Sequence, residues 1–487
     1  MKNDTLDMEK SDNNRFKAPA GQWIRFGIWT LVFVLLALWT RSWWWLLPVP
    51  FAFDLFITRF LPWFFWRKWK NKTLRTLMDW VDAIVFALVA VYFVFLLFFQ
   101  NYQIPSSSLE KSLLVGDFLI VNKASYGPRM PITPLSFPLA QHTMPLVGGK
   151  SYIEKPQWPY RRIAGLGRVQ RGDIVVFNFP TGDTVALNMQ NPDYYTICHS
   201  LMQERQMSRS QAAAYVHQHP EIFGPVVWRP VDRRENYVKR CVGLPGDSLQ
   251  IIDNQVYVNG SPLPDAPGVQ YNYFVQTRGG QIPERQFEQW GVSRDDRLML
   301  AENNALASLL GFTPAAGGQR IYHFPATAEV IERVRKAPNI QDVKIEKARL
   351  GDYSLGGYVF PLDGRVTWTR DDFGPLWIPA KGATIALNEH NEILYGRAIR
   401  VYEGHQLEQR GGRYYLDGEP ADTYTFSMDY YWMMGDNRHN SADSRYWGFV
   451  PEDHVVGRPM LVWLSLDKDN AWFKGKIRWN RFFKKAR

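Results

Sequence analysis

Cysteine and histidine are scarce in this chain of 487 residues. Its two cysteines, Cys198 and Cys241, could pair outside the cytoplasm, but one bridge cannot scaffold a region of this size. Nine histidines are scattered, and the only close pair, His217 and His219, has no cysteine or carboxylate cluster beside it. We therefore expect that pair at the surface rather than at a metal site. Internal repeats and low-complexity tracts are also absent, which excludes a repeat architecture.

Long apolar runs, in contrast, dominate the first hundred residues. The clearest covers residues 83–99 and rises about 25 Å as a helix, close to the roughly 30 Å of a bilayer core. Two further stretches precede it at residues 26–39 and 43–58, and the second is interrupted by two prolines and an aspartate. The sequence therefore predicts an N-terminal helical membrane anchor over residues 23–102 with about three spans, of which the middle one is the least regular.

Positive charges around these runs indicate the orientation of the anchor. Lysines and arginines gather before the first run and in the loop at residues 67–79, whereas only Arg41 lies in the first turn. By the positive-inside rule, the 1–22 tail and the 67–79 loop are cytoplasmic, and everything after Tyr102 is extracytoplasmic. The start lacks a short apolar region with a small-residue cleavage site, so we expect no removable signal peptide.

Beyond the anchor the pattern is that of a mainly antiparallel β domain. Short runs rich in Val, Ile, Phe and Tyr alternate with Gly-Asp and Asn-Gly pairs, and we place the β core at residues 103–260 and 385–466. Asp253-Asn254 stands where a tight hairpin turn would join two strands, and RGGRYYLDG at residues 410–418 repeats that pattern.

Two stretches differ from this pattern. Residues 181–236 contain a helical segment at 201–219, and residues 262–384 form a longer mixture with a helix expected near 328–337. We interpret both as α/β insertions into one β core.

Formal net charge is +10, and much of the excess lies in the juxtamembrane loop and in a basic, aromatic tail at residues 467–487. Such a tail fits an anionic lipid surface, and an ordinary solvated tail is the equal alternative. A nucleic-acid partner is excluded in practice because the domain is expected outside the cytoplasm.

Four segments carry the chemistry. They are IPSSSLEKSLLVGDFLIV from residue 104, RGDIVVFNFP from 171, YVKRCVGLPGD from 237 and MGDNRHNSADSRYWGFVP from 434. In order and spacing the set resembles type I signal peptidases (bacterial leader peptidases, S26-type), the membrane-bound Ser/Lys proteases that remove signal peptides from exported preproteins. The resemblance implies a hydrolase of the cell (inner) membrane with a periplasmic catalytic domain and no metal or cofactor.

The resemblance also implies the two principal catalytic residues, Ser108 as nucleophile and Lys239 as general base. A serine hydroxyl needs a neighbouring base, and an ammonium cannot serve as one. Lowering a lysine pKa from about 10.4 to about 8 requires roughly 3.3 kcal/mol, which burial among apolar residues can supply. Val238, Val242 and Leu244 flank Lys239 in an apolar strand. Ser108 lies nine residues after Phe99, within about 30 Å of the bilayer.

Supporting roles transfer in the same way. Ser106 matches the hydroxyl that completes the oxyanion hole, and Ser441 matches a serine that orients the base. Asp443 and Arg445 match a supporting ion pair, for which a purely structural role is the likelier reading of the sequence. Gly435 would allow the backbone to approach the site closely.

One departure from the family pattern leaves an alternative open. Where the family has Ser-Met-x-Pro-Thr-Leu, this chain has Ser-Leu-Glu-Lys-Ser-Leu from Ser108, so a lysine, Lys111, replaces the proline. Ser108-x-x-Lys111 has the spacing of penicillin-binding proteins and β-lactamases, and Lys111 therefore competes for the role of base. Its partner motifs are missing: Lys-Thr-Gly is absent, and the only Ser-Asp-Asn lies on the cytoplasmic side. We expect Lys111 to be a solvated neighbour.

The expected partners are secretory preproteins and the lipid bilayer. A small-x-small motif would place two side chains on one face of an extended strand, where neighbouring shallow pockets could select them. The alternative is a non-catalytic membrane assembly protein that binds exported chains on the same fold.

Overall fold

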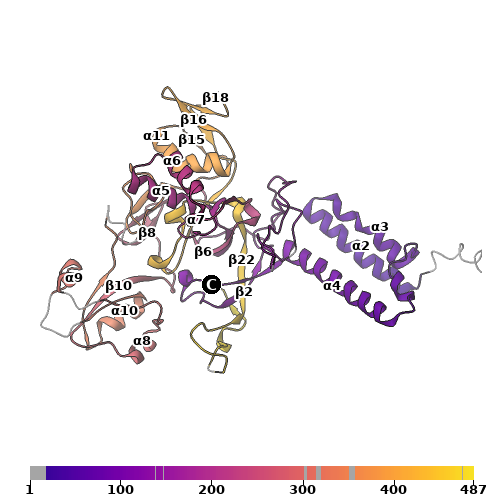
Figure 1. The fold of residues 1–487 in the computed structure, drawn as a ribbon, viewed down its shortest axis with the longest axis horizontal. Coiled ribbons are helices and arrows are strands. Elements are labelled where there is room, and N and C mark those ends of the chain that lie inside the picture. The colour runs from indigo at the N-terminus through magenta and orange to yellow at the C-terminus, as the bar shows by residue number, and fades with distance from the viewer. Residues whose placement is uncertain are drawn as a thin grey trace, which may run out of the picture.

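The computed structural model describes residues 18–137, 139–145, 147–300, 304–313, 320–349, 357–473 and 475–486. A helical anchor projects from one side of a larger, mainly β body (Figure 1). Most of the expected cytoplasmic tail, residues 1–17, lies outside the described ranges.

Two helices of the anchor are long and apolar enough to cross a membrane, α2 (Ala20–Thr40) and α4 (Lys72–Leu97). The middle stretch is helical over the predicted residues 43–58, with a 3-10 turn at Trp43–Leu46, α3 at Pro48–Phe53 and a π turn at Asp54–Thr58. It is shorter than the two long helices, and a third span stays a prediction. The turns end because Asp54 accepts hydrogen bonds from the amides of Phe60 and Leu61, at 2.8 and 3.0 Å, and Arg59 has a φ of 49°.

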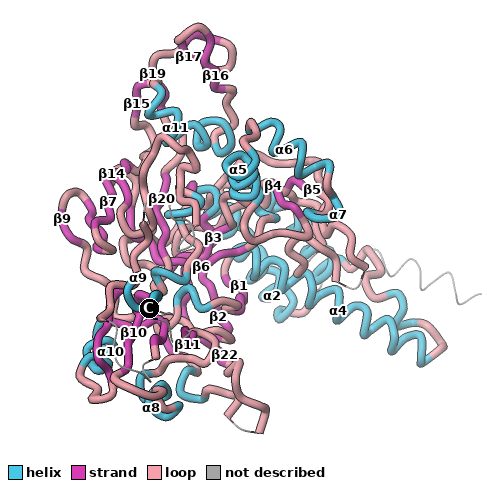
Figure 2. Tube along the Cα trace, turned by 60° about the vertical axis from the view of Figure 1, so that its left-hand side comes forward, coloured by secondary structure: helices cyan, strands magenta, loops and turns pink. Residues whose placement is uncertain are grey.

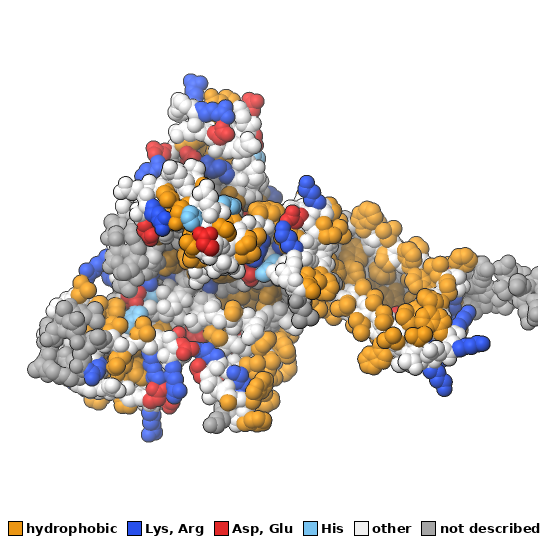
Figure 3. All heavy atoms as spheres, in the orientation of Figure 1, with side chains coloured by type: hydrophobic (Ala, Val, Ile, Leu, Met, Phe, Trp, Pro, Cys, Tyr) orange, Lys and Arg blue, Asp and Glu red, His pale blue; other side chains and the backbone are white. Residues whose placement is uncertain are grey.

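This short stretch nevertheless lies along both long helices. The rings of Trp23 and Phe53 are 6.2 Å apart, and those of Trp45 and Phe93 are 5.4 Å apart. Phe53 is therefore near the start of α2, whereas Trp45 is near the end of α4. The side chains of the anchor are largely apolar on the visible face (Figure 3).

The body is built on antiparallel sheets, as predicted. The main sheet has eight strands, with the order β1-β2-β22-β3-β6-β20-β21 and β23 added to β22. These strands are β1 (Phe99–Gln103), β2 (Asp117–Asn122), β3 (Ile174–Asn178), β6 (Asn236–Gly243), β20 (Tyr430–Met434), β21 (Val450–Pro451), β22 (Val455–Ser465) and β23 (Lys484–Lys485). Strand β2 alternates buried and half-buried residues, whereas β3 is buried throughout. The sheet thus brings the segments around 104, 174, 239 and 434 into one layer.

A second sheet packs beside it, with the order β14-β7-β8-β9. Its strands are β7 (Ser248–Ile252), β8 (Gln255–Val258), β9 (Ser261–Pro262) and β14 (Phe373–Trp377). Strands β7 and β8 are joined through Asp253 and Asn254, both with positive φ, which confirms that hairpin. Strand β14 pairs with β7, although its residues were placed in the second insertion.

The later hairpin is also present, between β16 (Leu407–Arg410) and β17 (Arg413–Leu416), and β18 (Glu419–Pro420) extends it. Near it lie β15 (Thr384–Ala386), paired with β19 (Thr423–Thr425), and α11 (Glu389–Arg397), which continues into a π turn at Ala398–Tyr402. Figure 2 shows these elements at one end of the body, and α8 (Glu284–Trp290) and α10 (Ala328–Arg335) at the other.

The segment 181–236 contains more than one helix. Its elements are β4 (Thr184–Ala186), α5 (Tyr194–Arg205), α6 (Arg209–Gln218), α7 (Pro220–Phe223) and β5 (Val226–Trp228). The stretch 201–219 is helical as predicted, but it is divided between α5 and α6, because Gln206 has a φ of 52° and Ser208 starts α6 with a capping box to Gln211. Cys198, on α5, and Cys241, on β6, are both buried and free.

The segment 262–384 contributes a four-stranded sheet with its own core. Its elements are β10 (Gln270–Thr277), α8 (Glu284–Trp290), β11 (Leu298–Leu300), α9 (Asn304–Leu309), β12 (Ile321–Thr327), α10 (Ala328–Arg335) and β13 (Ile340–Ile345). Helix α10 confirms the helix expected near 328–337. Phe287, Trp290 and Phe324 belong to this core, which is separate from that of the main sheet.

Candidate active site

Ser108 lies in a single 3-10 turn, Ser107–Leu109, just after β1. Leu109 and Leu113 are almost completely buried in the core of the main sheet, so they hold this loop against it. Ser108 itself is only 7% exposed. The turn thus presents a buried hydroxyl rather than a solvated one.

Lys239 reaches that hydroxyl from the centre of the sheet. It lies on β6, paired with Val175 of β3, and is 3% exposed. Its Nζ donates a hydrogen bond to Ser108 Oγ at 2.6 Å, across 131 residues of sequence. This is the distance at which an amine can take a proton from a hydroxyl.

Burial lowers the pKa of Lys239 from its ordinary 10.5 to about 8, against the opposing effect of the nearby carboxylates of Asp443 and Asp436. The amine is therefore neutral in a substantial fraction of molecules near pH 8. A neutral amine in contact with a serine hydroxyl can act as a general base.

Asp443 and Arg445 form the predicted ion pair, with 2.8 Å between Arg445 Nη2 and Asp443 Oδ2. Burial alone would raise the pKa of Asp443, but Arg445 and the amide of Gly435 hold it below its ordinary value. Asp443 also caps α12 (Ser444–Trp447) through the amide of Arg445. The pair thus fixes the backbone that runs behind Lys239.

Ser106 is exposed and lies beside the nucleophile, with 3.4 Å between its Oγ and Ser108 Oγ. Its backbone is extended, with φ −126° and ψ 159°, and Ser106 directly precedes the 3-10 turn that contains Ser108. A hydroxyl in this place can donate to an oxyanion that forms on a carbonyl attacked by Ser108.

Gly435 occupies a position where no side chain would fit. A Cβ there would lie 2.2 Å from Ser441 Oγ and 2.6 Å from the carbonyl oxygen of Ser108. The close backbone approach expected at this glycine is therefore present. Ser441 is buried, but the hydrogen bond found for its Oγ is to the carbonyl of Ala442 at 3.4 Å, and none joins it to Lys239 in the described part of the chain. Its orienting role stays a prediction.

Asp436 and Asn437 are two residues that the sequence reasoning missed. The Asn437 amide donates to the carbonyl of Ser108 at 3.0 Å, and its Nδ2 donates to the carbonyl of Ser107 at 3.2 Å. Asp436 accepts from Ser112 Oγ at 2.6 Å and from Arg240 at 2.7 and 2.8 Å. Both residues belong to the Gly-Asp-Asn-Arg motif, so the sequence could have marked them as candidates. Only the fold shows that they form hydrogen bonds with the nucleophile loop.

Lys111 has an exposed amine, as expected of a solvated neighbour, but that amine also has a partner. The residue as a whole is half-buried, and its Nζ donates to the carbonyl of Gly291 at 2.5 Å, in the second insertion. Ser108 Oγ is hydrogen-bonded to Lys239 instead. The arrangement therefore favours Lys239 over Lys111 as base.

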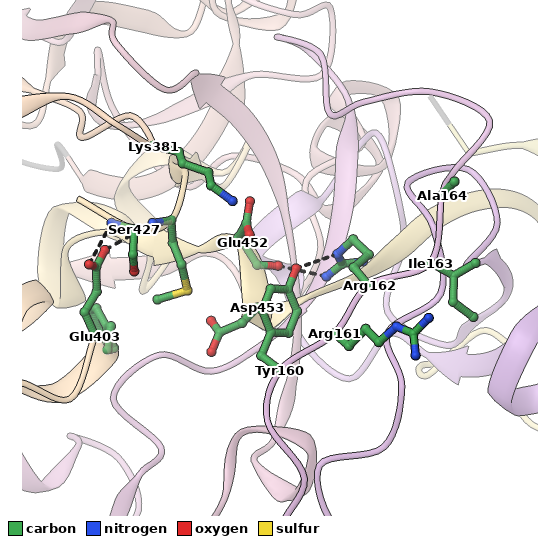
Figure 4. Close-up of a pocket in the computed structure, with 12 residues that line it drawn as sticks. Tyr160, Arg161, Arg162, Ile163, Ala164, Lys381, Glu403, Ser427, Glu452 and Asp453 are labelled. Carbon is green, nitrogen blue, oxygen red and sulfur yellow. Dashed lines mark hydrogen bonds between the residues drawn. The ribbon is translucent and has the colours of Figure 1, made fainter. Parts of the chain in front are cut away.

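A cavity of about 660 Å³ lies elsewhere, lined in part by Tyr160, Arg162, Lys381 and Glu452 (Figure 4). None of the predicted site residues lines it. Within the described ranges, no group of three or more His, Cys, Asp or Glu side chains is placed to hold a metal ion. The contact between the Ser108 hydroxyl and the Lys239 amine is suited to acyl transfer.

Comparisons with known proteins match most of the chain. The model of the family "Signal peptidase, peptidase S26" matches residues 77–308 and 391–464. Signal peptidase I of Buchnera aphidicola (from Acyrthosiphon pisum) is 24% identical over 423 residues, which cover 85% of this chain and 83% of that protein. Signal peptidase I of Haemophilus influenzae is 24% identical over 417 residues, 85% of this chain and 78% of that protein. Signal peptidase I of Helicobacter pylori 26695 is 36% identical over 114 residues, 20% of this chain and 39% of that protein.

Proposed function

The chain belongs to the peptidase S26 family of signal peptidases and is a serine-protease hydrolase, and from this premise we propose how and where it cleaves signal peptides. Ser108 is the nucleophile and Lys239 the general base of a membrane-bound endopeptidase that cuts exported preproteins after a small-x-small motif. The observation that carries this proposal is the 2.6 Å hydrogen bond between two buried groups, Lys239 Nζ and Ser108 Oγ.

The reaction proceeds through an acyl-enzyme. Neutral Lys239 takes the hydroxyl proton as Ser108 Oγ attacks the carbonyl carbon of the scissile bond. Ser106 Oγ, together with a backbone amide, donates to the oxyanion. Lys239, now an ammonium, gives its proton to the leaving amine as the C–N bond breaks. Water then attacks the ester carbonyl and passes one proton to Lys239, which returns it to Ser108 Oγ as the ester C–O bond breaks. The carboxylic acid product leaves and releases its remaining proton to solvent.

The contacts of the anchor support a catalytic site close to the bilayer. Trp39 Nε1, in the last turn of α2, donates to the carbonyl of Ala164 at 3.1 Å, and Arg161 donates to the carbonyl of Thr40 at 2.7 Å. Leu166, only two residues beyond Ala164, is 86% exposed. Strand β1 begins within two residues of the end of α4, so the same bilayer surface lies near Ser108.

The C-terminal tail supports the same placement. Trp472, Trp479 and Phe483 are largely exposed on it, among basic residues. Aromatic and basic side chains together favour an interface with anionic lipid. We therefore propose that the anchor crosses the bilayer three times, with the short stretch at residues 43–58 as the second crossing. The catalytic body is then extracytoplasmic.

The activity is tested with the detergent-solubilised full chain and a preprotein that carries a small-x-small site. We expect a single cut after that motif, identified by the N-terminal sequence of the product. Replacing the small residue before the cut with a bulky one should abolish cleavage. Binding of the preprotein without any cleavage would instead support the non-catalytic assembly function.

The topology is tested separately with reporter fusions. A reporter fused after Asn122 should be extracytoplasmic, and one fused near Lys72 should be cytoplasmic. The same compartment for both would overturn the placement of α4 as a span.

A further inference from the structure

Lys111 stands at a backbone position that disfavours a lysine. Its φ is +75°, in the left-handed region that non-glycine residues seldom adopt. The turn around it is closed by hydrogen bonds from the amides of Ser112 and Leu113 to the carbonyl of Leu109, at 3.1 and 2.8 Å. A proline, which the family pattern has here, could not adopt this φ. The nucleophile loop of this chain therefore takes its own conformation, three residues after Ser108.

The side chain of Lys111 crosses to a rigid part of the second insertion. Its Nζ donates to the carbonyl of Gly291 at 2.5 Å, and Gly291 ends α8 in a left-handed conformation. Helix α8 cannot move freely, because Phe287 and Trp290 are buried in the insertion's own core. The ammonium is thus attached to a fixed carbonyl at a helix C-terminus, where a cation is favoured.

Two further contacts fix the same part of the insertion beside the loop. A Cβ at Gly268 would lie 2.5 Å from Ser112 Oγ and 3.5 Å from Lys111 Cβ, so the two backbones are in direct contact there. Asp295, four residues after Gly291, forms an ion pair with Lys468 of the C-terminal tail. The carbonyl of Gly291 is therefore held relative to both the loop and the tail.

We propose that Lys111 is a positioning residue for the nucleophile: its ammonium ties the loop to the insertion and so holds Ser108 Oγ within reach of Lys239. This inference rests on the proposed function of Ser108 and Lys239, and it gives the insertion a part in catalysis. The contact opposes relaxation of the unfavourable φ at Lys111. Without it, the loop spends less time in the conformation in which Ser108 Oγ meets the base.

The test compares Lys111→Met, which keeps the length of the side chain, with Lys111→Arg, which keeps its donors. Lys344→Met is the matched control, because Lys344 also donates to a glycine carbonyl, that of Gly311, but within the insertion. We measure kcat and KM on a preprotein, the pH profile and the melting temperature. For Lys111→Met we expect kcat to fall about tenfold, as for the loss of a charged hydrogen bond, with KM, the apparent pKa and the melting temperature unchanged. Lys111→Arg should recover most of the rate, and Lys344→Met should match the wild type.

Lys111→Gly separates the lost contact from the backbone strain. Glycine adopts this φ without strain, so the loop should keep its conformation better without the contact, and Lys111→Gly should be faster than Lys111→Met. A Lys111→Gly variant no faster than Lys111→Met would overturn the proposal. Wild-type kcat in Lys111→Met, or a loss that follows the melting temperature, would overturn it as well. Ser108→Ala in the same assay distinguishes failure of this proposal from failure of the proposed function. Cleavage by the wild type but not by Ser108→Ala supports Ser108 as the nucleophile, whatever the result for Lys111→Met.

Discussion

Lys239 and Lys111 both lie near Ser108, in space or in sequence, but they differ in how deeply they are buried and in the group that each amine contacts. Lys239 is on a central strand, almost fully buried, and its amine meets the hydroxyl of Ser108. Lys111 is on the nucleophile loop, half-buried, and its amine meets a backbone carbonyl. A carbonyl can only accept a hydrogen bond, so the Lys111 amine donates to it and serves as a tie between two segments. An amine buried among apolar residues loses its proton more readily and can serve as a base.

The largest effects are expected when each lysine is replaced in turn. Ser108→Ala and Lys239→Ala should each abolish preprotein cleavage, and the double variant should be no worse than either, because members of a dyad act as a unit. Lys111→Ala should still cleave measurably, and His439→Ala should not mimic loss of the base. The assay is kcat/KM on a preprotein. If Lys239→Ala cleaved normally while Lys111→Ala were dead, the base would be misassigned.

The oxyanion hole should give the next largest effect. Ser106→Ala should lower kcat about 10²- to 10³-fold with little change in KM, because its hydroxyl would act only on the charge that develops in the transition state. The adjacent Ser107→Ala should cost much less and serves as the control. Near-normal turnover of Ser106→Ala would leave backbone amides as the only donors.

The pH profile should report the buried lysine. Because burial lowers the pKa of Lys239 to about 8, kcat/KM should rise about tenfold per pH unit below that value and level off above it. Lys111→Met should leave this midpoint in place. A profile that follows Lys111 would contradict the division of roles between the two lysines.

Replacing Lys239 should raise the stability of the fold although it abolishes activity. Its pKa is lower in the folded than in the unfolded chain, so the unfolded chain binds more protons between about pH 8 and 10.5, and stability rises with pH across that window. Below pH 8 the fold carries a buried ammonium. Lys239→Met should therefore stabilise the inactive protein at pH 7, by at most about 3 kcal/mol. The melting temperature in detergent measures this, and a lower value than the wild type would contradict it.

Much of the β body could be predicted from local patterns. Asp-Asn and Gly-Gly turns between alternating strands determined two hairpins, because such pairs adopt the positive φ that a two-residue turn needs. The stretch 201–219 is helical as predicted, but as two helices, because a left-handed residue and a capping serine interrupt an otherwise uniform helical composition. The middle stretch is helical over the predicted residues 43–58, and it ends there because the side chain of Asp54 accepts hydrogen bonds from the amides of Phe60 and Leu61.

The sequence by itself pointed to Ser108 and Lys239, through the family resemblance that the four motifs carry and through the apolar strand around Lys239. Only the tertiary structure decided that their side chains meet, that Asn437 braces the nucleophile and that Lys111 reaches a carbonyl 180 residues away. Local periodicity fixes the face and conformation of each segment. Burial and contact between distant segments depend on how sheets and insertions pack, and these set both the pKa of one lysine and the partner of the other.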